Sequence, residues 1–189
     1  MRGHDREILV VCTGNICRSP VAAGLLNHRL REKGFSVTSA GTHAVTGSPP
    51  APEAISFARD LDGIDLPWSA VQLTKHAAES ADLILTMTLA HRSHVIQLSP
   101  RSVRRAYTMI EFARITTLLE AGRTFETLAD FAEACAPLRR RAHTQIPNTE
   151  IPDLYGGPPE GYTESFTTVA RAAEEAAAAL SRSIGAVDP

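Results

Sequence analysis

Apolar positions along the chain follow two different periods, and their alternation predicts strands and helices in turn. Residues 8–11 form a continuous apolar run, as in a strand that is buried on both faces of a parallel sheet. From Ala22 to Leu30 the apolar residues recur every three or four positions, which is typical of a helix, and Gly34 supplies a stop. The last helix carries the longest such stripe, formed by Phe166, Val169, Ala170, Ala173, Ala177, Leu180 and Ile184.

The same patterns place elements along the rest of the chain. Strands are expected at 7–12, 36–40, 70–73 (short), 82–87 and 104–108. Helices are expected at 19–33, 51–61, 89–98, 109–121 and 124–136, and from Thr163 after an irregular stretch. Strands that alternate with helices predict an α/β fold with a parallel sheet covered on both faces. The length of 189 residues suits one domain, 1–189.

A cysteine-rich loop joins the first strand to the first helix and reads Cys-Thr-Gly-Asn-Ile-Cys-Arg-Ser-Pro from Cys12 to Pro20. We expect Cys12 at the carboxyl end of the strand, Ser19 as the N-cap of the helix and Pro20 as its first residue. Parallel sheets bind anions at this position. The five residues between Cys12 and Arg18 are enough to curl round a tetrahedral dianion with their N–H groups pointing inward.

The residue types in this loop suit phosphate chemistry. Gly14 tolerates the positive φ that such a curl needs, and Asn15 is the next most tolerant type. Arg18 offers a planar fork for two phosphate oxygens. A Cys12 thiolate, stabilised by the helix N-terminus and a guanidinium, is a candidate nucleophile, and Ser19 can donate a hydrogen bond to its sulfur. The alternative is that Cys12 is a small buried residue and Arg18 a surface residue.

The run from Val11 to Pro20 resembles the signature loop of the low-molecular-weight protein tyrosine phosphatases of the bacterial type. Further similar segments are Ser39-Ala40-Gly41-Thr42, Gln72-Leu73-Thr74, residues 81–87 and Pro152-Asp153-Leu154-Tyr155-Gly156-Gly157. The resemblance implies a three-layer α/β/α fold whose central four-stranded parallel sheet has the strand order 2-1-3-4. It also implies that the helical segment near 109–141 is enlarged. Its stripe of Phe125, Leu128, Ala132 and Cys135 is expected to pack on the sheet layer or to dock a partner.

The resemblance assigns roles to individual residues. The implied catalytic residues are Cys12, Arg18 and Asp153, with Asp153 as the general acid. The implied phosphate-binding loop consists of Thr13, Gly14, Asn15, Ile16, Cys17 and Ser19. Tyr155 and His43 are expected at the pocket rim, the alternatives being a loop anchor for Tyr155 and a surface histidine for His43. Asp153 could also be only a turn residue in a loop rich in Pro and Gly.

Two departures from the family pattern bear on the site. Leu154 stands where the family usually has proline after the general acid, which removes one fixed φ from that loop. Trp68 stands where members often have a histidine that supports the phosphate loop, and Val71 where they often have arginine. The role of that histidine passes to the Trp68 N–H, to Ser39 or to water.

The expected function is hydrolysis of phosphotyrosine in proteins through a phosphocysteine intermediate, with no cofactor and no metal. Ile16 matches the tyrosine-directed members, whereas arginine-directed members usually have threonine there, so a protein arginine phosphatase is the main alternative. An arsenate reductase of the same fold needs further cysteines close together, and Cys135 stands alone. A phosphoprotein-binding pseudophosphatase would not need the catalytic residues.

Composition limits the partners and the compartment. The formal net charge of −2 shows no basic excess, so phosphotyrosine-containing proteins are expected as partners, and neither nucleic acid nor a membrane. Three cysteines and a polar amino terminus without an apolar signal core suit the cytoplasm. A monomer or weak dimer is expected. Cys17 lies close to Cys12 in sequence, which predicts a redox-sensitive pair unless Cys17 is a packing residue. The run 139–141 is read as solvated arginines or as an attractor of phosphoproteins.

Overall fold

The computed structural model describes residues 6–66, 69–120, 122–146, 148–153, 155–157 and 159–185. Its central sheet contains β1 (Glu7–Cys12), β2 (Ser36–Gly41), β3 (Leu83–Thr86) and β4 (Ala106–Thr108). The strands are parallel and lie in the order β2-β1-β3-β4, which confirms the expected topology. The register pairs Cys12 with Gly41 and Val11 with Thr86, so β1, β2 and β3 end at one edge of the sheet.

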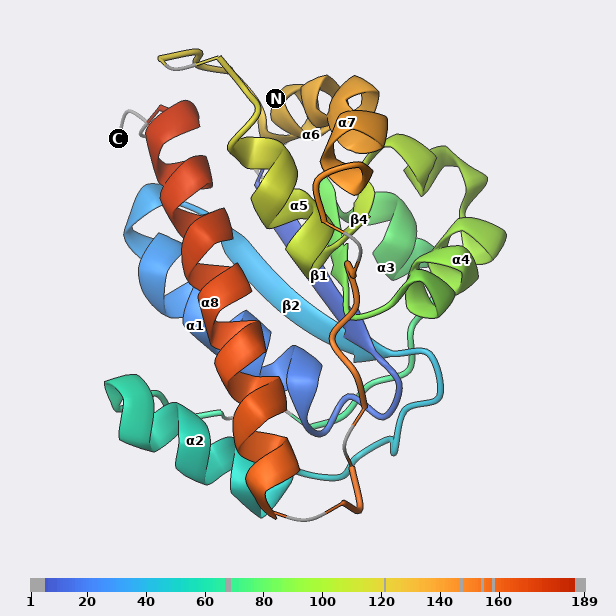
Figure 1. Cartoon of the computed structure of the whole chain (residues 1–189). Coiled ribbons are helices and arrows are strands. Elements are labelled where there is room, and N and C mark those ends of the chain that lie inside the picture. Colours follow the sequence, from blue (N-terminus) through green and yellow to red (C-terminus); the bar gives the residue numbers. More distant parts are fainter. Residues whose placement is uncertain are drawn as a thin grey trace.

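Helices cover both faces of this sheet. They are α1 (Arg18–Leu30), α2 (Pro52–Asp62), α3 (Lys75–Ser80), α4 (Leu89–Leu98), α5 (Met109–Thr116), α6 (Leu128–Cys135), α7 (Arg139–His143) and α8 (Pro159–Ser183). Figure 1 shows α1, α2, α5 and α8 on one side of the sheet and α3 and α4 on the other. Side chains alternate along β1: Ile8 and Val10 join the larger core under α1 and α8, and Leu9 and Val11 join the smaller core under α3 and α4. The three-layer prediction is therefore confirmed.

The stripe predicted for the last helix is buried along its whole length. However, α8 begins at Pro159, four residues before the expected Thr163, so residues 159–162 are helical, whereas the described residues between α7 and α8 form no helix or strand, as expected. Proline is favourable in the first turn of a helix, because the N–H group that it lacks has no partner there.

The expected pair of long helices after Met109 is wrong in detail, since three short helices occupy 109–143. A capping box formed by Thr108 and Glu111 starts α5, which ends at Thr116, and the side chain of Thr127 caps α6. The expected packing is confirmed, because the stripe side chains of α6 lie in the core. The short helices α3 and α7 were not anticipated. The expected strand at 70–73 is a single bridge between Gln72 and Gly41.

Arg139, the first residue of the arginine run, departs from the expected solvated face, whereas the other two arginines agree with it. Arg139 Nε lies 2.8 Å from a carboxylate oxygen of the fully buried Glu111, and its guanidinium lies 4.5 Å from the centre of the Tyr107 ring. A buried carboxylate needs such a partner, so Arg139 holds α7 against α5. Arg140 and Arg141 are exposed.

Candidate active site

The loop between β1 and α1 places Cys12 at the end of the central strand. The helix begins at Arg18 with Cys17 as its N-cap, so the expected cap at Ser19 is wrong. Ser19 lies inside the first turn, where its Oγ is 3.0 Å from Cys12 Sγ. Its hydroxyl group therefore contacts the Cys12 sulfur and does not cap the helix.

Asn15 organises the loop beneath the sulfur. It has φ = 57° and takes the left-handed conformation that was expected of Gly14. Its backbone N–H donates to Cys12 Sγ at 3.3 Å, and its Nδ2 donates to Ser19 Oγ and to Ser39 Oγ, each at 2.9 Å. Because Ser19 Oγ accepts from Asn15, its own proton is available to the sulfur. Ser39 thus takes the supporting role that a histidine often has in the family, and Trp68 lies outside the described residues.

Backbone hydrogen bonds join the segment after β2 to the phosphate-binding loop. Thr42 N–H donates to Cys12 O at 2.9 Å, and His43 N–H donates to Thr13 O at 3.0 Å. A Cβ at Gly41 would lie 2.4 Å from Thr13 O, a contact that real structures do not show. Only glycine at this position lets the two backbones approach so closely.

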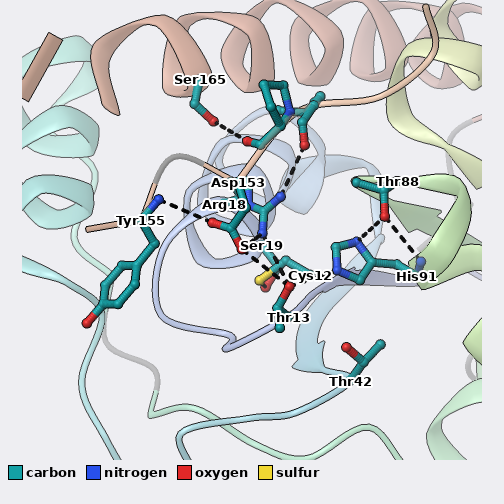
Figure 2. Close-up of polar contacts among 12 residues, drawn as sticks. Cys12, Thr13, Arg18, Ser19, Thr42, Thr88, His91, Asp153, Tyr155 and Ser165 are labelled. Carbon is teal, nitrogen blue, oxygen red and sulfur yellow. Dashed lines mark hydrogen bonds and ion pairs between the residues drawn. The ribbon is translucent and has the colours of Figure 1, made fainter. Parts of the chain in front are cut away.

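The segment that carries Asp153 is tied to the sheet and to Arg18. Ile151 N–H donates to Met87 O at 2.8 Å, and Arg18 Nη1 donates to Ile151 O at 3.1 Å. Arg18 Nη2 forms an ion pair with Asp153, whose side chain is 45% exposed (Figure 2). Ser165 Oγ on α8 donates to Pro152 O at 3.3 Å. Leu154, the departure from the family pattern, lies outside the described residues.

His91 is a site residue that was not anticipated from the sequence. Its Nε2 lies 2.9 Å from Thr13 Oγ1 and its Nδ1 lies 3.0 Å from Thr88 Oγ1 (Figure 2). Thr13 Oγ1 in turn lies 3.4 Å from both Arg18 Nη2 and Asp153 Oδ2. Burial, aided by the charge of Arg18, lowers the pKa of His91 to about 4, so the ring is neutral at pH 7.

These groups surround a cavity of about 220 Å³. Its lining includes the three residues expected to be catalytic (Cys12, Arg18 and Asp153), the two rim residues (Tyr155 and His43), four of the expected loop residues (Thr13, Gly14, Ile16 and Cys17) and the unanticipated Val45. The remaining loop residues, Asn15 and Ser19, are buried beneath it. Tyr155 is 62% exposed and stands at the mouth. The expected constellation is therefore gathered at one place.

The arrangement offers a nucleophile, an anion clamp and a proton donor around one space. Sγ receives hydrogen bonds that stabilise a thiolate, and the guanidinium binds oxygens of a tetrahedral anion. A carboxyl group at the mouth is suited to protonating a leaving group. Among the described residues, no group of three His, Cys, Asp or Glu side chains could hold a metal ion.

Comparison with known proteins agrees with this geometry. The sequence model of the low molecular weight phosphotyrosine protein phosphatases matches residues 7–122. The chain belongs to this family. A protein of Ralstonia nicotianae named "Probable low molecular weight protein-tyrosine-phosphatase EpsP" is 35% identical over 143 residues, which cover 75% of this chain and 94% of that protein. A protein-arginine-phosphatase of Geobacillus stearothermophilus is 35% identical over 106 residues, which cover 56% of this chain and 70% of that one.

Solved structures from both groups share the fold. The tyrosine phosphatase AmsI of Erwinia amylovora has a TM-score of 0.71 and 27% identity, with 94% of each chain covered. The YwlE arginine phosphatase of Geobacillus stearothermophilus has a TM-score of 0.70 and 26% identity, with 93% of each chain covered. The family consists of metal-independent hydrolases that act on proteins, and this chain is classed with them. None of the helices in the described part of the chain is long and apolar enough to cross a membrane.

Proposed function

We propose that this protein is a cysteine-dependent phosphatase that hydrolyses phosphotyrosine in proteins. The observation that carries the proposal is the position of Cys12 Sγ, which lies 3.0 Å from Ser19 Oγ and 3.3 Å from Asn15 N in a cavity that Asp153 also lines. A thiolate held in this way can attack a phosphorus atom bound by the loop. The carboxyl group of Asp153 then faces the leaving oxygen.

Binding exchanges one anion for another on Arg18. The guanidinium is paired with Asp153 in this structure, and its Nε has no hydrogen-bond partner among the described residues. A phosphate dianion binds the guanidinium in place of the carboxylate, and the backbone N–H groups of the loop take up its remaining oxygens. Asp153 is thereby released toward the leaving group, and beside the bound dianion its carboxylate takes up a proton from solvent, which makes it the general acid.

Two displacements at phosphorus complete the reaction. In the first, the Cys12 thiolate forms the P–S bond, the P–O bond to tyrosine breaks, and Asp153 gives its proton to the leaving phenoxide. In the second, water attacks phosphorus while the Asp153 carboxylate takes a proton from that water. The P–S bond breaks, and the thiolate leaves onto the hydrogen bonds from Ser19 and Asn15.

Two substitutions test this mechanism with p-nitrophenyl phosphate as substrate. Cys12→Ser removes the nucleophile and Arg18→Ala removes the anion clamp, so each is expected to abolish turnover. Treatment with a chelator is expected to have no effect. If a chelator stops the reaction while Cys12→Ser leaves it running, the mechanism is wrong.

Dependence on the leaving group tests the role of Asp153. Loss of a general acid costs about 10²–10⁴-fold in rate when the leaving group needs a proton. Asp153→Ala is therefore expected to slow phosphotyrosine strongly and to slow esters of very acidic phenols much less. An equal loss for both kinds of ester would assign Asp153 to structure.

Preference for phosphotyrosine over phosphoarginine is supported by the cavity wall. Ile16 and Tyr155 both line the cavity, and an aliphatic side chain together with an aromatic ring suits a flat, apolar substrate group. The arginine-directed relatives keep the second candidate open. Values of kcat/KM on matched phosphotyrosine and phosphoarginine peptides decide between them. Ile16→Thr is expected to move the ratio toward arginine, and a wild-type preference for phosphoarginine overturns the assignment.

A further inference from the structure

A second cavity of about 480 Å³ adjoins the phosphate cavity. Ile16, Val45 and Tyr155 line both, so the two spaces share a wall. Val45 and Tyr155 are 49% and 62% exposed, although large apolar side chains are usually covered. We call the second cavity the side groove. Because the two cavities share these residues, a ligand bound in the phosphate cavity can extend into the side groove.

Three prolines contribute to the lining of the side groove. Pro49, Pro50 and Pro52 line it, and Ala51 N–H donates to Ile16 O at 2.7 Å, which fastens this proline segment to the phosphate loop. Proline has a fixed φ and no N–H group, so the segment is rigid and presents apolar rings. It is suited to packing against side chains.

The far wall comes from the start of α8, which Figure 1 shows beside the start of α2. Tyr162 lines the groove, and its ring lies 6.0 Å from that of Phe166. Gly156 N–H donates to Tyr162 Oη at 2.8 Å, so this wall is joined to the segment that carries Tyr155. The proline segment and the start of α8 are therefore each hydrogen-bonded to a segment of the phosphate site.

One charged side chain faces the groove. Glu53, in the first turn of α2, is exposed and lines it, and no ion pair joins Glu53 to another described residue. The other described residues of the lining are uncharged. A ligand that packs apolar groups on the prolines and carries a positive charge complements this surface.

We propose that the side groove binds the polypeptide that flanks the phosphorylated residue, and that it favours an apolar side chain next to Lys or Arg. The proposal rests on the proposed function, because it takes the phosphate cavity as the place where the phosphorylated side chain binds. It adds the identity of the neighbouring residues. A small aryl phosphate has no flanking residues to place in the groove, so it reports on the phosphate cavity alone.

Glu53→Lys tests the charge, with Glu126→Lys as a matched control. Glu126 is an equally charged, exposed residue beside Phe125, whose N–H donates to Ser183 O at the opposite end of α8. The readout is the ratio of kcat/KM for two phosphotyrosine peptides, one with Val-Arg flanks and one with Val-Glu flanks. The wild type and Glu126→Lys are expected to prefer the basic peptide by about threefold, the range of exposed ion pairs. Glu53→Lys is expected to reverse the preference.

Ser48→Trp tests the groove itself. Ser48 lines the side groove and does not line the phosphate cavity, so a large ring there obstructs only the flanking chain. It is expected to raise KM about tenfold for the peptides and to change KM for p-nitrophenyl phosphate much less. Equal effects on peptides and p-nitrophenyl phosphate, or an unchanged peptide ratio in Glu53→Lys, overturn the proposal. Failure of the wild type to hydrolyse any aryl phosphate would instead contradict the proposed function.

Discussion

His91 Nε2 lies 2.9 Å from Thr13 Oγ1, across 78 residues of sequence. The backbone N–H of His91 donates to Thr88 Oγ1 at 3.2 Å, which leaves the Thr88 hydroxyl proton free to face His91 Nδ1. With Nδ1 accepting, Nε2–H donates to Thr13, and the Thr13 hydroxyl donates to Asp153. Every donor in this series of hydrogen bonds then has an acceptor. A neutral histidine thus holds the threonine that touches both Arg18 and Asp153.

Removal of this hydrogen bond is the first test of His91 as a positioning residue. His91→Phe keeps a ring but loses both ring nitrogens, and His91→Gln retains a side-chain N–H donor. One hydrogen bond corresponds to about a fivefold change. We expect kcat/KM for a phosphotyrosine peptide to fall by about that factor in His91→Phe and to be largely restored in His91→Gln. Equal activity in all three proteins contradicts the assignment.

The low pKa of His91 also predicts sensitivity to acid. The folded protein binds the proton with a pKa of about 4, against 6.5 for a free histidine. Between these values the unfolded chain binds more protons, so stability falls as the pH falls from 6.5 toward 4. The shift corresponds to about 3 kcal/mol in all.

Urea unfolding at pH 7 and pH 4.5 measures this effect. We expect the wild type to lose on the order of 2 kcal/mol more than His91→Gln over this interval. The charged or titratable neighbours of His91, namely Arg18, Asp153, Glu150 and His94, are present in both proteins and serve as the internal control. The same loss in both proteins would show that His91 does not carry the effect.

The sequence contained most of the site because the phosphate loop is local. Cys12, Arg18 and the residues between them are contiguous, so strand, loop and helix patterns located them together. Within the loop, the left-handed residue is Asn15 and not Gly14, because the Asn15 side chain has three partners that hold it there. The local conformational propensities of glycine and asparagine allow a left-handed conformation at either position. Only the tertiary contacts decide between them.

Long-range partners explain what the sequence did not predict. His91 lies on a helix with no local feature that marks it, and its role depends on the packing of α4 beside the loop. Arg139 looked like part of a solvated run, because its partner Glu111 is 28 positions earlier in the chain. The helices α3 and α7 are too short for apolar residues to repeat with the helical period, so the sequence pattern did not indicate them.

Cys17 leads to a redox prediction. Burial, with the neighbouring Cys12, raises the pKa of Cys17 to about 12, so this thiol is protonated at neutral pH. Peroxide is expected to oxidise Cys12 to the sulfenic acid, which Cys17 then converts to a disulfide with release of water. Since the thiolate is the attacking form, capture is expected to accelerate as the pH rises.

Mass spectrometry of the oxidised protein checks this reaction, with Cys17→Ala as the control. Wild-type activity should return on addition of a thiol, whereas Cys17→Ala should progress to irreversible sulfinic acid at Cys12. An unpaired Cys17 beside an overoxidised Cys12 in the wild type would contradict the predicted Cys12–Cys17 disulfide. Cys17 would then be a packing residue.

Gly41 offers a test of the support beneath the loop. A Cβ at this position would lie 2.4 Å from Thr13 O and 3.0 Å from Ala44 Cα, and neither backbone atom can rotate away. Gly41→Ala is therefore expected to shift the Thr13 carbonyl, to lower stability by about 1–3 kcal/mol and to reduce kcat/KM at least tenfold. Gly185→Ala, where a Cβ meets nothing within 4 Å, is the neutral control in the same urea and kinetic measurements. If Gly41→Ala matches that control in both measurements, the close approach of the two backbones does not position the loop.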